Sequence, residues 1–167
     1  DKAVFPGLQG GPHNHITAGM AVAFKEAMSD EFKEYVAQVV KNSQELCNSL
    51  KSMGYDIISG GTDNHMFLVN IMSSSGIGGE EASSILEKVN ITVNKNAIPY
   101  DNRKPWDPSG IRIGTPAVTT RGMKEKDMTK IAVFIDTAIK NRDNEEVLKR
   151  LKLDVQDFAS KFPIPGI

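Results

Sequence analysis

Apolar residues recur at spacings of three and four along several stretches of the chain, which is the pattern of an α-helix with one buried face. Ser29 and Asp30, good residues for a helix start, separate the first stretch from the second, and Gly54 ends the second. The pattern predicts a helix that begins at Ile16, a second over residues 31–53, a third near 80–89, a fourth that carries Met128 to Ile139, and one or two short helices before Pro163.

Four shorter stretches have the composition or the alternation of β-strands, and they cover residues 55–59, 65–72, 91–94 and 110–114. The first two are joined too tightly for a parallel crossover, so they must pair antiparallel. An irregular loop with three prolines occupies residues 95–109. The order of elements predicts an α+β fold in which a small, mostly antiparallel sheet is covered by helices.

The composition is that of a soluble globular protein with one core. Of the 167 residues, 40% are hydrophobic and 25% are charged, and the formal net charge is -1. This balance gives no cationic field for nucleic acid, and no apolar run is long enough to cross a bilayer. A lone cysteine, Cys47, excludes an intrachain disulfide and fits a reducing compartment. We therefore expect a cytoplasmic protein with no nucleic-acid and no membrane partner.

The predicted strand over residues 110–114 contains the sharpest candidate for a binding residue. Neighbouring side chains on a strand point to opposite faces, so Ile111 and Ile113 share one face and Arg112 lies on the other. A guanidinium can bind a carboxylate through two parallel hydrogen bonds, and the flanking glycines, Gly110 and Gly114, leave room for a ligand. An exposed arginine on the outer face of a sheet is the simpler alternative, and the residues alone favour it.

Two successive glycines, Gly10 and Gly11, stand shortly before the first predicted helix. Backbone N–H groups of such a pair can close on an anion without a Cβ in the way, so the pair is a candidate phosphate contact. A plain turn is the alternative, and a lone glycine pair is weak support for anything more.

The remaining polar candidates have ordinary structural interpretations. His13 and His15 lack a cysteine or an acid at ligand spacing, and His65 stands beside Asp63 at a strand start. Ordinary hydrogen-bonded histidines are the favoured interpretation over a metal site, so we predict no metal. Cys47 lies on an apolar stripe of a helix, which predicts a buried thiol. The run of Asn94, Lys95 and Asn96 could bind a polar heterocycle, but residues of this kind before a proline-containing loop more often form a turn.

Three long stretches of the chain resemble the serine hydroxymethyltransferase family. They occur in the family's order, at spacings close to its own, and together they span most of the chain. They are residues 3–13 (AVFPGLQGGPH), residues 60–65 (GGTDNH), and residues 93–99 (VNKNAIP) continued by 109–117 (SGIRIGTPA) and 119–122 (TTRG).

The resemblance implies the C-terminal portion of an enzyme that interconverts serine and glycine and transfers a one-carbon unit to tetrahydrofolate on pyridoxal phosphate. It implies that residues 1–15 end the large cofactor domain and that residues 16–53 form a linking helical region. Residues 54–167 would then be the C-terminal small domain of a fold-type-I, aspartate-aminotransferase-like enzyme. The family also implies a homo-oligomer, a dimer or a tetramer.

The resemblance assigns roles to individual residues. Arg112 matches the arginine that binds the amino-acid carboxylate, which reverses the simpler interpretation above. Asn96 matches the asparagine that hydrogen-bonds the pteridine ring of the folate, and Phe5 matches an aromatic residue of the partner's folate pocket. Gly10 and Gly11 match the pair that contacts the cofactor phosphate across the dimer.

One family feature is missing from this sequence, and it limits the expected activity. The Schiff-base lysine lies in a Thr-Thr-His-Lys context, which this chain does not contain, and Lys95 is expected to be a loop lysine. A chain without that lysine is expected to be inactive alone and not to bind pyridoxal phosphate. The alternatives are a stand-alone module that binds a carboxylate or a folate, or a dimer-interaction module, each without catalysis.

Overall fold

The computed structural model describes residues 1–166, which form two compact units, Asp1–Val36 and a second unit that begins at Ala37. Helix α2 (Asp30–Ser52) begins in the first unit and continues into the second. The assignment of residues 1–15, 16–53 and 54–167 to parts of a larger enzyme stays a prediction.

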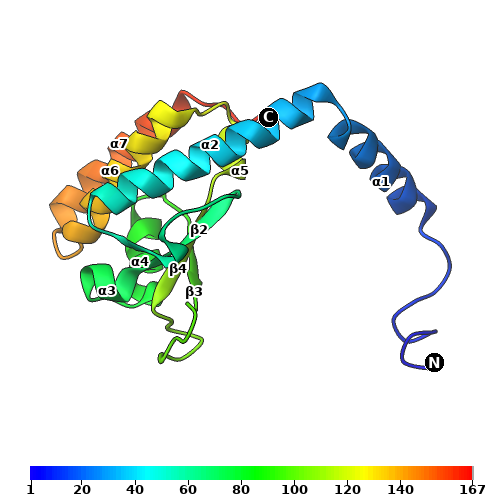
Figure 1. Cartoon of the computed structure of the whole chain (residues 1–167), viewed down its shortest axis with the longest axis horizontal. Helices are drawn as coiled ribbons and strands as arrows, with labels where there is room; N and C mark the ends of the chain where they lie inside the picture. Colours follow the sequence, from blue (N-terminus) through cyan, green and yellow to red (C-terminus); the bar gives the residue numbers. More distant parts are fainter. Residues whose placement is uncertain (167) are drawn as a thin grey trace. The chain divides into compact units, whose positions relative to one another are not determined.

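The first unit contains a turn-rich segment followed by helix α1 (Asn14–Ala27), drawn in blue in Figure 1. The predicted first helix is therefore present, but none of its residues is buried. Its apolar residues remain exposed within the chain: Ile16, Met20, Val22 and Phe24 have exposed fractions of 50% or more. Such a stripe normally packs against another surface.

The second unit is built on one four-stranded sheet in the order β1-β2-β4-β3. All three strand pairs are antiparallel, which confirms the predicted pairing of the first two strands and the predicted α+β class. The strands are β1 (Asp56–Ile57), β2 (Met66–Asn70), β3 (Asn94–Asn96) and β4 (Gly110–Gly114).

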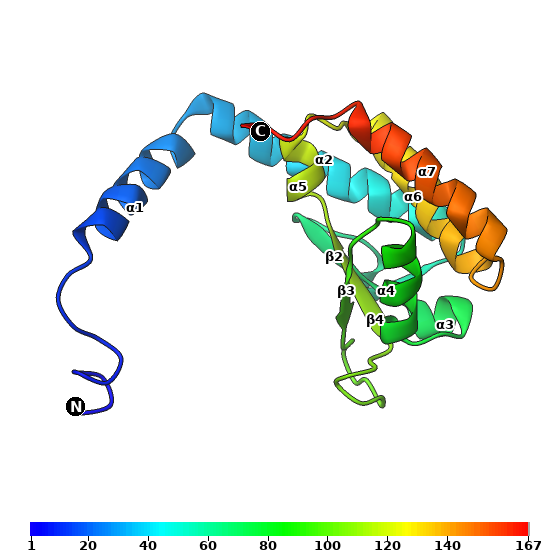
Figure 2. The same cartoon turned by 180° about the vertical axis from the view of Figure 1, so that it is seen from behind.

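Helices pack on this sheet and on one another, and α6 and α7 lie side by side in both views (Figures 1 and 2). The predicted helices near 80–89 and around 128–139 are confirmed, and the tail forms a single helix. The helices that follow α2 are α3 (Ile71–Ser75), α4 (Gly79–Lys88), α5 (Pro116–Thr120), α6 (Glu125–Lys140) and α7 (Glu145–Ser160).

The hydrophobic core lies on one face of the sheet. Phe67 and Val69 of β2 stand opposite Ile113 and Ile111 of β4, so the four side chains share a face, and all four are buried. Helix α4 packs against β3 and β4, and its buried side chains join the same core. Burial of each large side chain contributes about 1.5–3 kcal/mol. Cys47 is buried in this core, as the apolar stripe of α2 predicts.

Two predicted strands are shorter in the structure than the sequence predicts. The strand over 65–72 stops at Asn70, whose side-chain oxygen accepts a hydrogen bond from the Ser73 N–H at 3.2 Å and caps α3. The strand over 55–59 gives way to a 3-10 turn, Ile58–Gly60, in which Ser59 has a φ of 60°.

The strand predicted over residues 91–94 is correct only at Asn94, because the paired residues are 94–96. Ile91 and Val93 instead pack against the core without a partner strand, which explains the apolar alternation. The run from Asn94 to Asn96 is therefore a strand paired with β4, and its interpretation as a turn is also wrong.

Helix α5, which the sequence pattern did not predict, follows β4 directly and is held by buried hydrogen bonds. Thr115, fully buried, donates its hydroxyl to the Val39 carbonyl at 2.9 Å. The Asn42 amide donates to the Thr119 hydroxyl at 2.8 Å and to the Met123 carbonyl at 2.9 Å. These bonds fix the end of β4 against α2, since breaking a buried hydrogen bond costs about 1–3 kcal/mol.

Candidate functional site

Arg112 occupies the outward face of β4, as the alternation predicts. Its neighbours Ile111 and Ile113 are 1% and 5% exposed, while Arg112 itself is exposed. The two isoleucines anchor the strand in the core and leave the guanidinium at the surface. The face was therefore predictable from the sequence.

The groups beside Arg112 come from both neighbouring strands. Leu68 on β2 and Asn94 on β3 stand directly opposite it in the sheet. The Arg112 Nη2 donates a hydrogen bond to the Asn94 Oδ1 at 3.2 Å, and among the described residues no carboxylate forms an ion pair with Arg112. One amide thus orients the guanidinium, whose charge is free to bind an anion.

Asn96 lies on the same face, one step further along β3, where it is the diagonal neighbour of Arg112. Its side-chain Nδ2 donates to the Ala97 carbonyl at 2.6 Å. The structure therefore brings the two residues assigned to the amino acid and to the folate onto one small surface.

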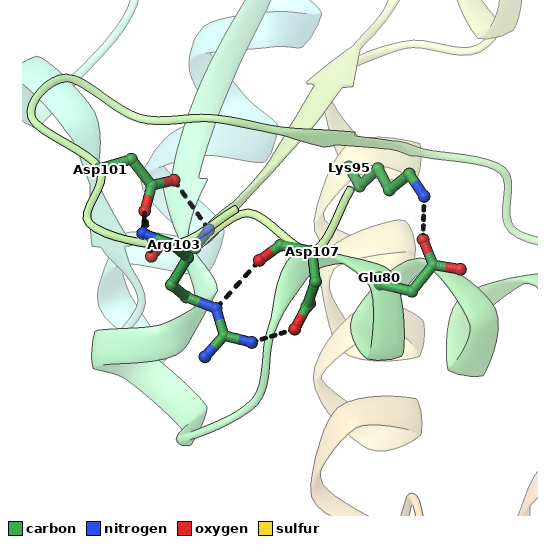
Figure 3. Close-up of polar contacts among 6 residues, drawn as sticks. Glu80, Lys95, Asp101, Arg103 and Asp107 are labelled. Atoms are coloured by element: carbon green, nitrogen blue, oxygen red, sulfur yellow. Dashed lines mark hydrogen bonds and ion pairs between the residues drawn. The ribbon is translucent and has the colours of Figure 1, made fainter. Parts of the chain in front are cut away.

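Lys95, between the two asparagines, points to the other face of the sheet and pairs with Glu80 of α4 (Figure 3). It is a strand residue rather than the loop lysine that the sequence suggested. Its ion pair joins β3 to the start of α4, and at an exposed surface such a pair adds little stability, about 0–1 kcal/mol.

The loop from residue 97 to residue 109 is organised by Asp101, which the sequence interpretation did not identify. Its carboxylate accepts hydrogen bonds from the N–H groups of Ile98 (3.3 Å), Arg103 (3.0 Å) and Ser109 (2.9 Å) and from the Ser109 hydroxyl (2.7 Å). Partial burial alone would raise the pKa of this carboxyl, but the hydrogen bonds outweigh it and lower the pKa to about 2. An aspartate inside this proline-containing loop was the available signal, because aspartate side chains accept hydrogen bonds from the backbone two residues on, as Asp101 does from Arg103.

A second polar contact closes the same loop. Arg103 forms an ion pair with Asp107 and donates from Nε to the Asp107 carbonyl at 3.1 Å (Figure 3). The pair lies so close to Gly78 that a Cβ there would meet the Asp107 Oδ1 at 2.2 Å. At Gly79 a Cβ would meet the Gly110 carbonyl at 2.2 Å, so two glycines let α4 approach the loop.

The flanking glycines of β4 do not act as the sequence suggested. A Cβ at Gly110 would meet the Ile98 Cγ2 at 2.5 Å and the Asn96 carbonyl at 2.8 Å, so the chain itself fills the space that a ligand was expected to use. A Cβ at Gly114 would meet its nearest atom, the His65 carbonyl oxygen, at 3.4 Å, which is ordinary contact. Only Gly114 therefore leaves room beside Arg112.

The other candidates lie in the first unit and are described there alone. Phe5 is 65% exposed, and a Cβ added at Gly10 or Gly11 would meet nothing within 4 Å in the part of the chain that the structure describes. The rings of His13 and His15 lie 6.0 Å apart, edge to face. Among residues 1–166 no group of three His, Cys, Asp or Glu side chains could hold a metal ion.

Arg121, within the last of the motif stretches, has a structural role that its position in the sequence does not reveal. Its Nε and Nη2 donate to the carbonyls of Phe162 (2.7 Å) and Ala159 (2.6 Å), at the end of α7. A cation that satisfies the last carbonyls of a helix stabilises that end.

An α+β domain with an antiparallel sheet and an outward arginine is consistent with the small domain of a fold-type-I pyridoxal-phosphate enzyme. Comparison with known proteins identifies the family. The sequence model of serine hydroxymethyltransferase matches residues 1–135, and the chain belongs to the serine hydroxymethyltransferase family.

Curated relatives agree with this family assignment. The chain is 53% identical to the serine hydroxymethyltransferase of Acidobacterium capsulatum and 52% identical to that of Methanosarcina barkeri, over 99% and 98% of its own length. These matches cover 39% and 40% of the two relatives, so the chain spans about two-fifths of their length. Correspondence to only a part of the enzyme agrees with the predicted C-terminal portion and does not favour a stand-alone module.

Serine hydroxymethyltransferases use pyridoxal phosphate, whose binding needs phosphate donors and a Schiff-base lysine. The exposed backbone at Gly10 and Gly11 fits a phosphate contact. Lys95 does not fit the second requirement, because it pairs with Glu80 on the face of the sheet opposite to Arg112. These residues therefore fit one part of such a site.

Within residues 1–166, no helix is both long and apolar enough to cross a membrane.

Proposed function

We propose that this chain forms the amino-acid and folate side of a serine hydroxymethyltransferase active site, and that it has no activity alone. The observation that carries the proposal is the exposed Arg112 guanidinium, oriented by an amide and paired with no described carboxylate. In the complete enzyme the reaction interconverts serine and glycine and transfers a one-carbon unit to tetrahydrofolate.

Arg112 binds the carboxylate of the amino acid through two parallel N–H···O bonds, which fix both the position and the orientation of the substrate. Asn94 holds the guanidinium from the side, so less side-chain freedom is lost when the substrate binds. Bound pyridoxal phosphate supplies the electron sink for the carbanion at the alpha carbon of the amino acid.

Asn96 hydrogen-bonds the pteridine ring of the folate. Its side-chain amide carries donors and an acceptor, which suits the alternating donors and acceptors of a polar heterocycle. Its place on the diagonal from Arg112 puts the folate next to the amino acid, as a one-carbon transfer between them requires.

The first unit supplies contacts to a partner subunit of a homo-oligomer. Gly10 and Gly11 contact the cofactor phosphate of the partner's site, and Phe5 contacts its folate. The exposed apolar stripe of α1 supports this assignment, because apolar stripes of this kind are normally covered. We also propose a cytoplasmic location, which the lone cysteine supports.

Replacement of Arg112 by lysine in the full-length enzyme tests the proposal. An ammonium keeps the charge but cannot form the two-point contact, so the dissociation constant of serine should rise about 10- to 100-fold. Titration calorimetry on the pyridoxal-phosphate-loaded enzyme measures this constant. Arg150→Lys, at an exposed position of α7, is the matched control and should leave the constant unchanged. Unchanged serine affinity in Arg112→Lys would remove this residue from the site.

A further inference from the structure

Asp101 joins the two ends of the loop that separates β3 from β4. Its Oδ2 accepts from the N–H of Ile98, two residues after Asn96, and from the N–H of Ser109, which directly precedes β4. The last paired residues of the two strands are Asn96 and Gly110. One carboxylate thus links the two chain segments just beyond the last backbone pair of β3 and β4.

The contact with Ile98 also orients Asn96, because both act on the same peptide group. The Ile98 N–H and the Ala97 carbonyl belong to one planar amide, in which N–H and C=O point in opposite directions. Asp101 accepts from the N–H side at 3.3 Å, and the Asn96 Nδ2 donates to the C=O side at 2.6 Å. A rotation of this peptide plane would therefore displace the Asn96 amide.

We call this chain of contacts, from Asp101 through the Ala97–Ile98 peptide to the Asn96 side chain, the relay. It depends on a carboxylate rather than on any polar group of that size. All four contacts of Asp101 come from donors, and an ionised carboxylate accepts at both oxygens. An asparagine at this position keeps one accepting oxygen, so its NH₂ group faces either the Ile98 and Ser109 N–H groups or the Arg103 N–H and the Ser109 hydroxyl. In each orientation at least one backbone N–H loses its acceptor. Pro99, which follows Ile98, restricts the Ile98 backbone to extended conformations. This restriction further limits the orientations that the Ala97–Ile98 peptide can take.

We propose that Asp101 is a positioning residue for folate: through the Ala97–Ile98 peptide it holds the Asn96 side chain where that amide meets the pteridine ring. The proposal rests on the proposed function in one respect, the contact between Asn96 and the folate. The relay itself is a property of this chain and is tested separately from that contact.

The first test compares ligand affinities of the full-length enzyme by calorimetry. Asp101→Asn should weaken folate binding about tenfold, the effect of one lost hydrogen bond, and change serine binding less than about twofold. Asp107→Asn makes the same chemical change in the same loop, at an exposed ion pair, and should change neither affinity. Equal losses for serine and folate in Asp101→Asn would indicate general disorder of the loop and overturn the proposal.

A double substitution shows whether Asp101 acts through Asn96. If it does, Asn96→Ala combined with Asp101→Asn should weaken folate binding no more than Asn96→Ala alone, within about twofold. Additive losses would mean that Asp101 affects the folate by another route, and the relay would be wrong.

Amide NMR of this chain tests the relay without any ligand. Asp101→Ala, which removes both accepting oxygens, should shift the side-chain amide signals of Asn96 and the backbone signal of Ile98, whereas Asp107→Ala should leave the Asn96 signals in place. Preserved dispersion of the core signals verifies that the variant is folded. Unmoved Asn96 signals overturn the relay. Moved signals with an unchanged folate affinity in Asn96→Ala would retain the relay and reject the proposed function of Asn96.

Discussion

At the scale of single residues, two groups of opposite charge, Arg112 and Asp101, differ in how their charges are hydrogen-bonded. Arg112 is held by one neutral amide, so its charge remains available to a ligand. Asp101 receives four hydrogen bonds from its own loop, so its charge is used inside the protein. These contacts distinguish the proposed binding residue, Arg112, from the proposed positioning residue, Asp101.

The lowered pKa of Asp101 predicts a contribution to stability that depends on pH. The pKa is 3.8 for an ordinary aspartate and about 2 in the folded chain, so the contribution is complete above about pH 4 and disappears as the pH falls through about 2. We expect about 1–2 kcal/mol at pH 7, reduced from the full shift because the loop is partly solvated.

Urea denaturation of the chain and of Asp101→Asn, between pH 2 and pH 7, measures this contribution. The variant should be less stable at neutral pH and should approach the original chain near pH 2. Two stability curves that run parallel over the whole range would contradict the assignment of the low pKa to Asp101.

At the scale of elements, the hairpin of β3 and β4 is shaped by tight packing at glycines as much as by strand pairing. Ile98 packs over Gly110, and the loop that carries Ile98 packs over Gly78 and Gly79 at the start of α4. These contacts leave no space for a Cβ at three of the glycines near the site. The glycines therefore belong to the packing of the hairpin and its loop rather than to the ligand.

Two glycines of the same strand give a matched pair of substitutions. Gly110→Ala should destabilise the chain by about 1–3 kcal/mol, because its Cβ would lie 2.5 Å from the Ile98 Cγ2 and 2.8 Å from the Asn96 carbonyl oxygen. Gly114→Ala, with its nearest atom at 3.4 Å, should change stability by less than about 0.5 kcal/mol. Chemical denaturation measures both, and equal effects would argue against the tight packing at Gly110.

At the scale of the whole molecule, the chain's burial is concentrated in the second unit. The buried hydrophobic residues begin at Val39 and end at Val155, and residues 1–28 are all exposed. Helix α2 carries its own start signals, because the Ser29 hydroxyl accepts from the Phe32 N–H at 3.1 Å and Asp30 and Glu31 occupy its first turn.

Removal of residues 1–28, so that the chain begins at Ser29, should therefore lower the free energy of unfolding by less than about 1 kcal/mol. Thermal or urea unfolding of the shortened chain measures this change. The shortened chain should also bind less of a hydrophobic dye, since Ile16, Met20 and Phe24 are removed with α1. A large loss of stability would show that residues 1–28 contribute to the core.

Much of the fold follows from local patterning. The helices that became α2, α4 and α6, the strand over residues 110–114 and the outward face of Arg112 were all predicted, because apolar periodicity reports which side of an element is buried. The motif stretches identified the family, and the serine hydroxymethyltransferases compared with the chain confirm it.

Tertiary structure alone decided the features that depend on contacts between distant residues. Lys95 and Asn96 became strand residues because Ile111 and Gly110 lie opposite them, and Gly110 became a packing position because Ile98 covers it. Asp101 became the centre of a loop because Ser109 returns to it eight residues later. The apolar periodicity of a segment carries no information about its contacts with distant residues, because strand partners and the space beside each residue depend on how the whole chain packs.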